Sequence, residues 1–138
     1  MGKRSTGRRL AMQVLYQADI TGESIDEALK KALRSDEEKY LDETKDFAVS
    51  LATGAFLKRE DLDREITKLS IDWPLDRIGI VDKSILRLAI YELKKGETPS
   101  SVVINEAVEL AKKYSSGEAA KFINGILGSF IRSSGKSA

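Results

Sequence analysis

Tyr16 is the side chain whose place on its predicted helix departs most from that of a core residue. In the helix predicted over about 7–19, the apolar residues gather on one side, and Tyr16 lies on the other. That polar side also carries Arg9, Met12 and Gln13. An aromatic ring beside a phosphate-binding cation suits single-stranded nucleic acid, because every base has a face that can stack. The alternative is that Tyr16 packs against a neighbouring helix with its hydroxyl in water.

A second unusual face is expected on the last predicted helix. Lys121, Gly125 and Gly128 lie on one stripe of that helix, and Asn124 is adjacent to it. Glycine costs roughly 1 kcal/mol relative to alanine inside a helix, so two glycines on one stripe indicate the close approach of another backbone. That backbone belongs either to a neighbouring helix of the same chain or to a partner. Phe122 lies at the edge of the apolar stripe, where its ring can be partly exposed.

Positive charge is concentrated at the two ends of the chain. The net charge is +1, but residues 1–18 hold four basic and no acidic side chains, and residues 112–138 hold five basic against one acidic. The middle, 19–111, therefore carries −7. Two basic ends make a polyanion site if they meet in space, and are merely solvated if they stay apart. We predict that the first and last helices begin side by side. The basic residues at the ends are Lys3, Arg4, Arg8, Arg9, Lys112, Lys113, Lys121, Arg132 and Lys136.

Several classes of function are disfavoured by composition. The chain has no histidine and no cysteine, which removes the commonest general base, the commonest metal ligand and thiolate chemistry. No phosphate-binding glycine loop and no zinc spacing occurs, and acidic runs such as 36–38 and 60–61 lie near predicted helix starts, where they favour the helix dipole. We expect no catalytic residue, no metal and no cofactor. No apolar run reaches the roughly 18 residues of a membrane span, and the basic start lacks a signal-peptide core, so we expect a cytoplasmic protein.

Helical spacing runs along the whole chain, and no strand signal rises above noise. Ser24 and Glu27 form a capping-box pattern that begins the second helix. The run at about 80–95 has little polar face, which predicts the central and most buried helix. Seven or so helices joined by short turns predict an all-α fold in one domain, 1–132, with a disordered tail at 133–138. The remaining helices are expected near Asp36, around Leu62, Ile66 and Leu69, briefly after Pro74, from Ser100 to before Gly117, and over about 118–132.

Four segments of the chain together resemble the NusB family. They are RRLAMQVLY at 8–16, GIVDKSILRLAIYEL at 79–93, VINEAVELAK at 103–112 and KFINGIL at 121–127. Each segment alone is moderately specific, and all four in this order at family-like spacing form a strong pattern. The resemblance covers nearly the whole chain and contains no large insertion.

The resemblance implies a fold of two packed three-helix bundles and a role in transcription antitermination rather than catalysis. It implies binding to boxA-type single-stranded RNA together with NusE, a ribosomal protein of the small subunit. It also implies assembly into the antitermination complex of RNA polymerase, which supports transcription of ribosomal RNA. The sequence leaves open whether the free protein is a monomer or a homodimer.

The resemblance also assigns residues, at positions that helical phase and charge had already singled out. Asp82 and Arg87 are carried over to the protein-partner side, although an internal salt bridge is an equally conceivable role for them. The run 5–7 interrupts the basic start, so RNA affinity without the partner could be weak. We expect Arg8 to be an exposed charge that contributes little to the core. The expected RNA-binding residues are Lys3, Arg4, Arg8, Arg9, Gln13, Tyr16, Lys121, Phe122 and Asn124.

Two alternatives belong to other functional classes. Domains of this fold also occur fused to ribosomal-RNA methyltransferases, although this chain has no motif for a methyl-donor cofactor. The other alternative is a helical adaptor that binds only proteins. Co-purifying RNA would separate the RNA-binding reading from the adaptor, and methyl-donor binding would reveal the enzyme.

Overall fold

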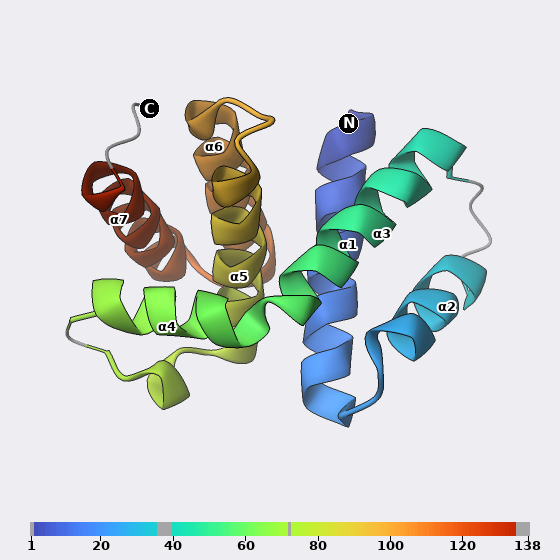
Figure 1. The fold of residues 1–138 in the computed structure, drawn as a ribbon, viewed down its shortest axis with the longest axis horizontal. Helices are drawn as coiled ribbons and strands as arrows, with labels where there is room; N and C mark the ends of the chain where they lie inside the picture. Colours follow the sequence, from blue (N-terminus) through green and yellow to red (C-terminus); the bar gives the residue numbers. More distant parts are fainter. Residues whose placement is uncertain (1, 36–39, 72, 135–138) are drawn as a thin grey trace.

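The computed structural model describes residues 2–35, 40–71 and 73–134, and within these ranges every regular element is helical (Figure 1). The all-α prediction is therefore confirmed. None of these helices is both long and apolar enough to cross a membrane. The elements are α1 (Lys3–Thr21), α2 (Ile25–Ser35), α3 (Asp42–Leu57), α4 (Arg59–Leu69), the short 3-10 helix η1 (Leu75–Arg77), α5 (Ile80–Lys95), α6 (Ser100–Tyr114) and α7 (Gly117–Ser133).

The helices form two bundles that share a central interface. Helices α1, α2 and α3 pack on one another at the right of Figure 1, and α5, α6 and α7 pack together at the left, with α4 lying across α5 and α7. Helix α5 contacts α1 and α3 of the first bundle as well as its own neighbours, so it joins the two halves. The predicted pair of packed bundles is confirmed.

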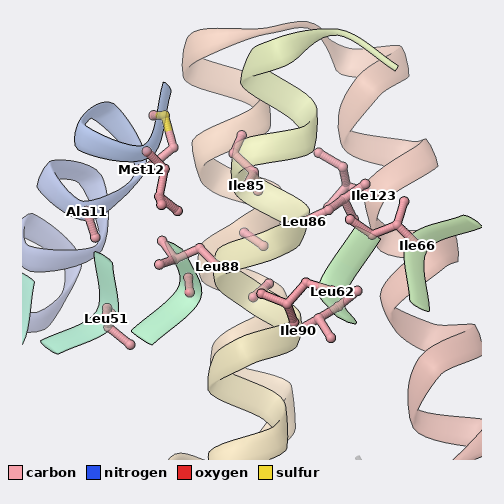
Figure 2. Packing of buried hydrophobic residues seen from close by; sticks show 14 of the residues in the cluster. Ala11, Met12, Leu51, Leu62, Ile66, Ile85, Leu86, Leu88, Ile90 and Ile123 are labelled. Atoms are coloured by element: carbon pink, nitrogen blue, oxygen red, sulfur yellow. The ribbon is translucent and has the colours of Figure 1, made fainter. Parts of the chain in front are cut away.

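The burial of α5 follows from its nearly continuous apolar sequence. Leu86 and Ile90 are fully buried, and the hydroxyl of Ser84 donates to the carbonyl of Ile80 at 2.8 Å, which satisfies a polar side chain inside the core. Gly96 then ends the helix in the left-handed conformation, at φ 70°. Figure 2 shows side chains of α5 packed against side chains of α1, α3, α4 and α7; the labelled ones are Ala11, Met12, Leu51, Leu62, Ile66, Ile85, Leu86, Leu88, Ile90 and Ile123.

Helix α1 begins four residues earlier than predicted, at Lys3. Gly7 does not interrupt it, because the helix needs this glycine for close approach to α3. A Cβ at Gly7 would lie 2.7 Å from a ring carbon of Phe47 and 3.3 Å from the carbonyl of Thr44. Met12 was expected on the polar side and is only 2% exposed. That expectation is wrong because α1 packs against α2, α3 and α5 and is therefore covered on more than one side.

Helix starts elsewhere depend on local capping. The Ser24 hydroxyl accepts the Glu27 amide at 3.1 Å, which confirms the start of α2. Ser116 does the same for the Ala119 amide at 3.0 Å and begins α7. The predicted third start near Asp36 lies outside the described residues, and α3 begins at Asp42. Ser133, expected in the tail, is the last residue of α7, and residues 135–138 are also outside the described part.

Candidate nucleic-acid interface

The first turn of α1 carries two exposed cations that already have neighbours on α3. The Lys3 ammonium lies 3.5 Å from the Glu43 carboxylate, and both side chains are more than half exposed. The Arg4 guanidinium lies 4.4 Å from the centroid of the Phe47 ring. Exposed ion pairs contribute little free energy, so a phosphate can compete for Lys3 at small cost.

Arg8, expected to be an exposed phosphate ligand, is buried and only 4% exposed. Its guanidinium donates to both oxygens of Glu92, at 2.8 and 2.5 Å, and to Glu106 at 3.0 Å. Burial alone would lower the pKa of Arg8, but the hydrogen bonds and charges of Glu92 and Glu106 outweigh it and hold that pKa above its ordinary value. The expectation of an exposed Arg8 is wrong because carboxylates of α5 and α6 cover it, and they lie 84 and 98 residues away in sequence.

Tyr16 lies on the polar face of α1, as its helical phase predicted. Arg9, Gln13 and Tyr16 are all half-buried. The Arg9 guanidinium donates to the Gln13 side-chain oxygen at 3.2 Å and to the Tyr40 hydroxyl at 3.3 Å. Tyr16 is not among the side chains packed against the hydrophobic core, and no described residue hydrogen-bonds its hydroxyl. The prediction that Tyr16 stands off the core is confirmed.

A groove of about 400 Å³ separates the start of α1 from the end of α6. Here Arg9 meets Lys112 and Lys113, so cations from both basic ends of the chain share one surface. The groove is lined by Ser5, Arg8, Arg9, Glu106, Glu109, Leu110, Lys112, Lys113 and Tyr114. We call it the α1–α6 groove. The sequence had supplied Lys112 and Lys113 as part of a charge sum, but nothing in it assigned them, or Tyr114, to the site.

The start of α7 lies elsewhere, which corrects the predicted pairing of the two helix starts. Helix α7 packs on α6, α5 and α4, and Figure 1 shows it on the opposite side of α5 from α1. Lys121 and Asn124 are exposed there, and the region around Gly125 is open, because no atom of the described residues outside its own helix turn lies within 4 Å of a Cβ built on it. The alternative in which another helix of the same chain packs on Gly125 is therefore wrong.

Phe122 contributes to a second groove, of about 310 Å³, between the starts of α5 and α7. Trp73, Arg77 and Asp82 also line it, and Trp73 is 51% exposed. Oxygen Oδ1 of Asp82 is buried and has no hydrogen-bond partner among the described residues. A buried carboxylate oxygen without a donor is costly, and the rest of the Asp82 side chain lines this α5–α7 groove beside the two aromatic rings, where Glu118 of α7 is the other acid. The exposure of Trp73 could not be read from its position before Pro74.

Arg87, the other residue carried over to the partner side, is 6% exposed and bridges helices inside the protein. It donates two hydrogen bonds of 2.7 Å to Asp63 of α4 and lies 3.7 Å from Asp19 of α1. Burial alone would lower the pKa of Arg87, but the hydrogen bonds and charge of Asp63, with the charge of Asp19, raise it above its ordinary value. The alternative role, an internal salt bridge, is the one that the structure supports.

The helical architecture and the α1–α6 groove indicate the general class of this protein. Two helical bundles carry a basic, aromatic groove at their junction, and no group of His, Cys, Asp or Glu in residues 2–35, 40–71 and 73–134 could hold a metal ion. The described residues thus form an all-helical protein with a basic surface groove. The model of the NusB family matches residues 5–132, and the chain belongs to that family. Members of this family are transcription antitermination factors, so the chain is such a factor and not an enzyme.

Individual relatives agree with this assignment. The chain is 42% identical to the transcription antitermination protein NusB of Symbiobacterium thermophilum, over 94% of this chain and 89% of the relative. It is 44% identical to the NusB protein of Desulfitobacterium hafniense, over 96% and 90%. It also superimposes on a crystal structure of antitermination factors NusB and NusE in complex with double-stranded RNA, with a TM-score of 0.88 and 30% identity, covering 96% and 98% of the two chains.

Proposed function

We propose that this chain binds boxA-type single-stranded RNA together with NusE and joins the antitermination complex of RNA polymerase. It would act in the cytoplasm as one domain of about 1–132 and support transcription of ribosomal RNA. The observation that carries the proposal is the α1–α6 groove, where Arg9, Lys112 and Lys113 gather beside an aromatic side chain. A related NusB protein has been crystallised with NusE and RNA, although that RNA is double-stranded.

The RNA would follow the start of α1. Lys3 and Arg4 are exposed cations at the first turn of α1, and Arg9, Gln13 and Tyr16 follow on one stripe of the same helix. Phosphates would be neutralised by the cations, and an unpaired base would stack on Tyr16. Arg8 would hold α1 in place rather than touch RNA, because its guanidinium is enclosed by Glu92 and Glu106.

NusE would bind at the α5–α7 groove. The groove presents the rings of Trp73 and Phe122 beside the Asp82 carboxylate. Aromatic anchors next to a buried acceptor are typical of protein–protein contacts, and ribosomal proteins are usually basic. Lys121, Phe122 and Asn124, which were expected to bind RNA, lie on α7 and do not line the α1–α6 groove, so any contact that they make with RNA lies on the α7 side of the molecule.

The decisive measurement is the affinity of a boxA-like single strand for the chain with and without NusE. Replacing Tyr16 by Ala should cost roughly 1–3 kcal/mol of RNA binding, the usual loss for a stacking aromatic. The Tyr16→Phe variant keeps the ring and should bind as the parent does. Lys68→Ala is the charge control, since Lys68 is exposed on α4 and pairs with no described residue.

Two results would redirect the proposal. RNA binding that is equally tight in the parent and in a folded Tyr16→Ala variant would remove Tyr16 from the RNA surface. Binding of NusE with no detectable RNA affinity, alone or in the complex, would favour the protein-binding adaptor.

A further inference from the structure

The α1–α6 groove is chemically more specific than a phosphate site needs to be. A phosphate site requires cations and backbone donors, whereas this groove also contains an aromatic ring, Tyr114, and two carboxylates, Glu106 and Glu109. A carboxylate repels phosphate. Glu109 pairs with Lys112, whereas Glu106 uses only one of its two oxygens for Arg8 and Ser5. The groove volume of about 400 Å³ falls within the range of roughly 300–1,000 Å³ typical of small-molecule sites.

Glu106 is held so that one of its oxygens stays available to a ligand. Its Oε1 atom accepts hydrogen bonds from Arg8, at 3.0 Å, and from the Ser5 hydroxyl. Its Oε2 atom accepts none from the described residues, and the side chain is 22% exposed. Arg8 is fixed in turn by Glu92. The carboxylate is therefore preorganised, with a free acceptor at the groove.

Tyr114 offers a half-buried ring in the lining of the same groove. The Lys113 ammonium lies 5.5 Å from its centroid, so the ring and an exposed cation already adjoin. Lys112 pairs with Glu109 at 3.7 Å, but both side chains are 58% exposed, and such a pair is easily exchanged for a phosphate contact. Ring, cations and acceptor are the three parts that a nucleotide would use.

We propose that the α1–α6 groove holds one unpaired nucleotide of the bound RNA and selects its base. The base stacks on Tyr114, Arg9 and Lys113 bind the flanking phosphates, and Oε2 of Glu106 accepts a hydrogen bond from an exocyclic amino group. Adenine, cytosine and guanine carry such a group. Uracil instead has carbonyl oxygens on both sides of its one ring N–H, and the carboxylate repels them. This inference rests on the proposed RNA-binding function and adds base selection to it.

The stacking part is tested with the full chain, NusE and a boxA-like strand. Tyr114→Leu keeps much of the apolar volume that packs on the core but removes the π-face, and it should weaken RNA binding about tenfold. Tyr114→Phe keeps the ring and should bind within about twofold of the parent. Thermal denaturation checks that both variants fold. If the Leu variant does not fold, the Glu106 test below decides the proposal without it.

The selection part is tested with strands in which each non-uridine position in turn becomes uridine. For the parent protein, this change should weaken binding about tenfold at one position of the strand, and much less at the neighbouring positions. Glu106→Gln keeps an acceptor for Arg8 and Ser5, but its amide can also donate to a uracil carbonyl. The uridine penalty at that position should therefore disappear in this variant.

The outcomes separate this inference from the function beneath it. If the parent binds no RNA even with NusE, the proposed function itself fails. If the parent binds RNA and Tyr16→Ala weakens it, while Tyr114→Leu and Glu106→Gln bind and discriminate as the parent does, only the nucleotide pocket is refuted. If Tyr114→Leu weakens binding but Glu106→Gln leaves the uridine penalty intact, base selection by Glu106 is refuted.

Discussion

The guanidinium of Arg8 in α1 and the carboxylate of Glu92 in α5 form two parallel hydrogen bonds, of 2.8 and 2.5 Å, and each side chain is 5% exposed. Helix α1 belongs to the first bundle and α5 to the second, so this pair joins the two. A planar guanidinium facing a carboxylate is the geometry in which an ion pair is strongest and most directional. The same Arg8 also fixes Glu106 at the wall of the α1–α6 groove.

Replacing Arg8 by Ala should lower the free energy of unfolding by about 3–5 kcal/mol, because Glu92 is left buried without its partner. The free energy of unfolding of Arg8→Lys should lie between those of Arg8→Ala and the parent, since one ammonium cannot reproduce the two parallel bonds. Urea unfolding measures both. Lys68→Ala, on an exposed turn of α4, should stay within about 0.5 kcal/mol of the parent. An Arg8→Ala protein as stable as the parent would show that Arg8 is not needed between the bundles.

Stability should be nearly independent of pH between 6 and 9. The pKa values of Arg8 and Arg87 are raised in the folded protein, so their contribution is complete below the ordinary arginine value and is lost only far above pH 9. The chain has no histidine or cysteine to titrate in this window. Urea unfolding at several pH values should give free energies within about 1 kcal/mol of one another. A steep change near pH 7 would contradict this expectation and would show that another group of the protein changes its pKa on folding.

The sequence predicted the elements whose burial is decided locally. The apolar run of α5 was expected at about 80–95, and the helix spans Ile80–Lys95. The side of α1 that holds Tyr16 followed from helical phase alone. Arg8 shows the limit of this reasoning. Phase indicates which direction a side chain takes, but only tertiary structure determines that Glu92 and Glu106 meet Arg8 there.

Only part of the candidate site could be predicted, because the sequence does not show which helices face one another. Charge sums indicated that the two basic ends could meet, and they do meet, at Arg9 and Lys113. Which helix of the C-terminal segment faces α1 depends on how α6 and α7 turn back on α5. A charge sum over 112–138 cannot distinguish the end of α6 from the start of α7, so the start of α7 was wrongly paired with the start of α1.

Two helical glycines should respond in opposite ways to alanine. A Cβ at Gly54 would lie 2.0 Å from the hydroxyl oxygen of Tyr91 and 2.2 Å from its ring, so Gly54→Ala should destabilise the fold by about 1–3 kcal/mol through overpacking. Gly125 faces open space, and Gly125→Ala should stabilise by roughly 0.5–1 kcal/mol through helix propensity. Denaturant unfolding compares them directly. Equal effects from both would mean that propensity, not the contact with Tyr91, dominates.

Salt dependence should distinguish cations that touch phosphate from cations that hold the fold. Affinity for RNA falls as salt rises, so the slope of log affinity against log salt is negative. Losing one phosphate contact on a single strand makes this slope less steep by about 0.7. Arg9→Ala and Lys113→Ala should each show this reduction, because both residues line the α1–α6 groove. Lys68→Ala should leave the slope unchanged. The idea fails if the Arg9 and Lys113 variants keep the parent's slope while they remain folded.

Asp82 should matter for NusE more than other acids of the same region. Its side chain lines the α5–α7 groove with Trp73 and Phe122 and forms no ion pair with the described residues, so its negative charge is available to a basic group of the partner. Asp82→Asn should weaken NusE binding about tenfold and make association less sensitive to salt, because an attractive charge is lost.

The matched control is Asp76→Asn. Asp76 is exposed on η1, close in sequence, but it does not line the α5–α7 groove. It should change NusE affinity by less than about twofold, since an exposed charge outside the contact acts only at long range. Phe122→Ala should also weaken binding, through the loss of an aromatic anchor. Titration calorimetry at two salt concentrations measures all three variants. If folded Asp82→Asn and Phe122→Ala proteins bind NusE as tightly as the parent does, the partner lies on another face of the molecule.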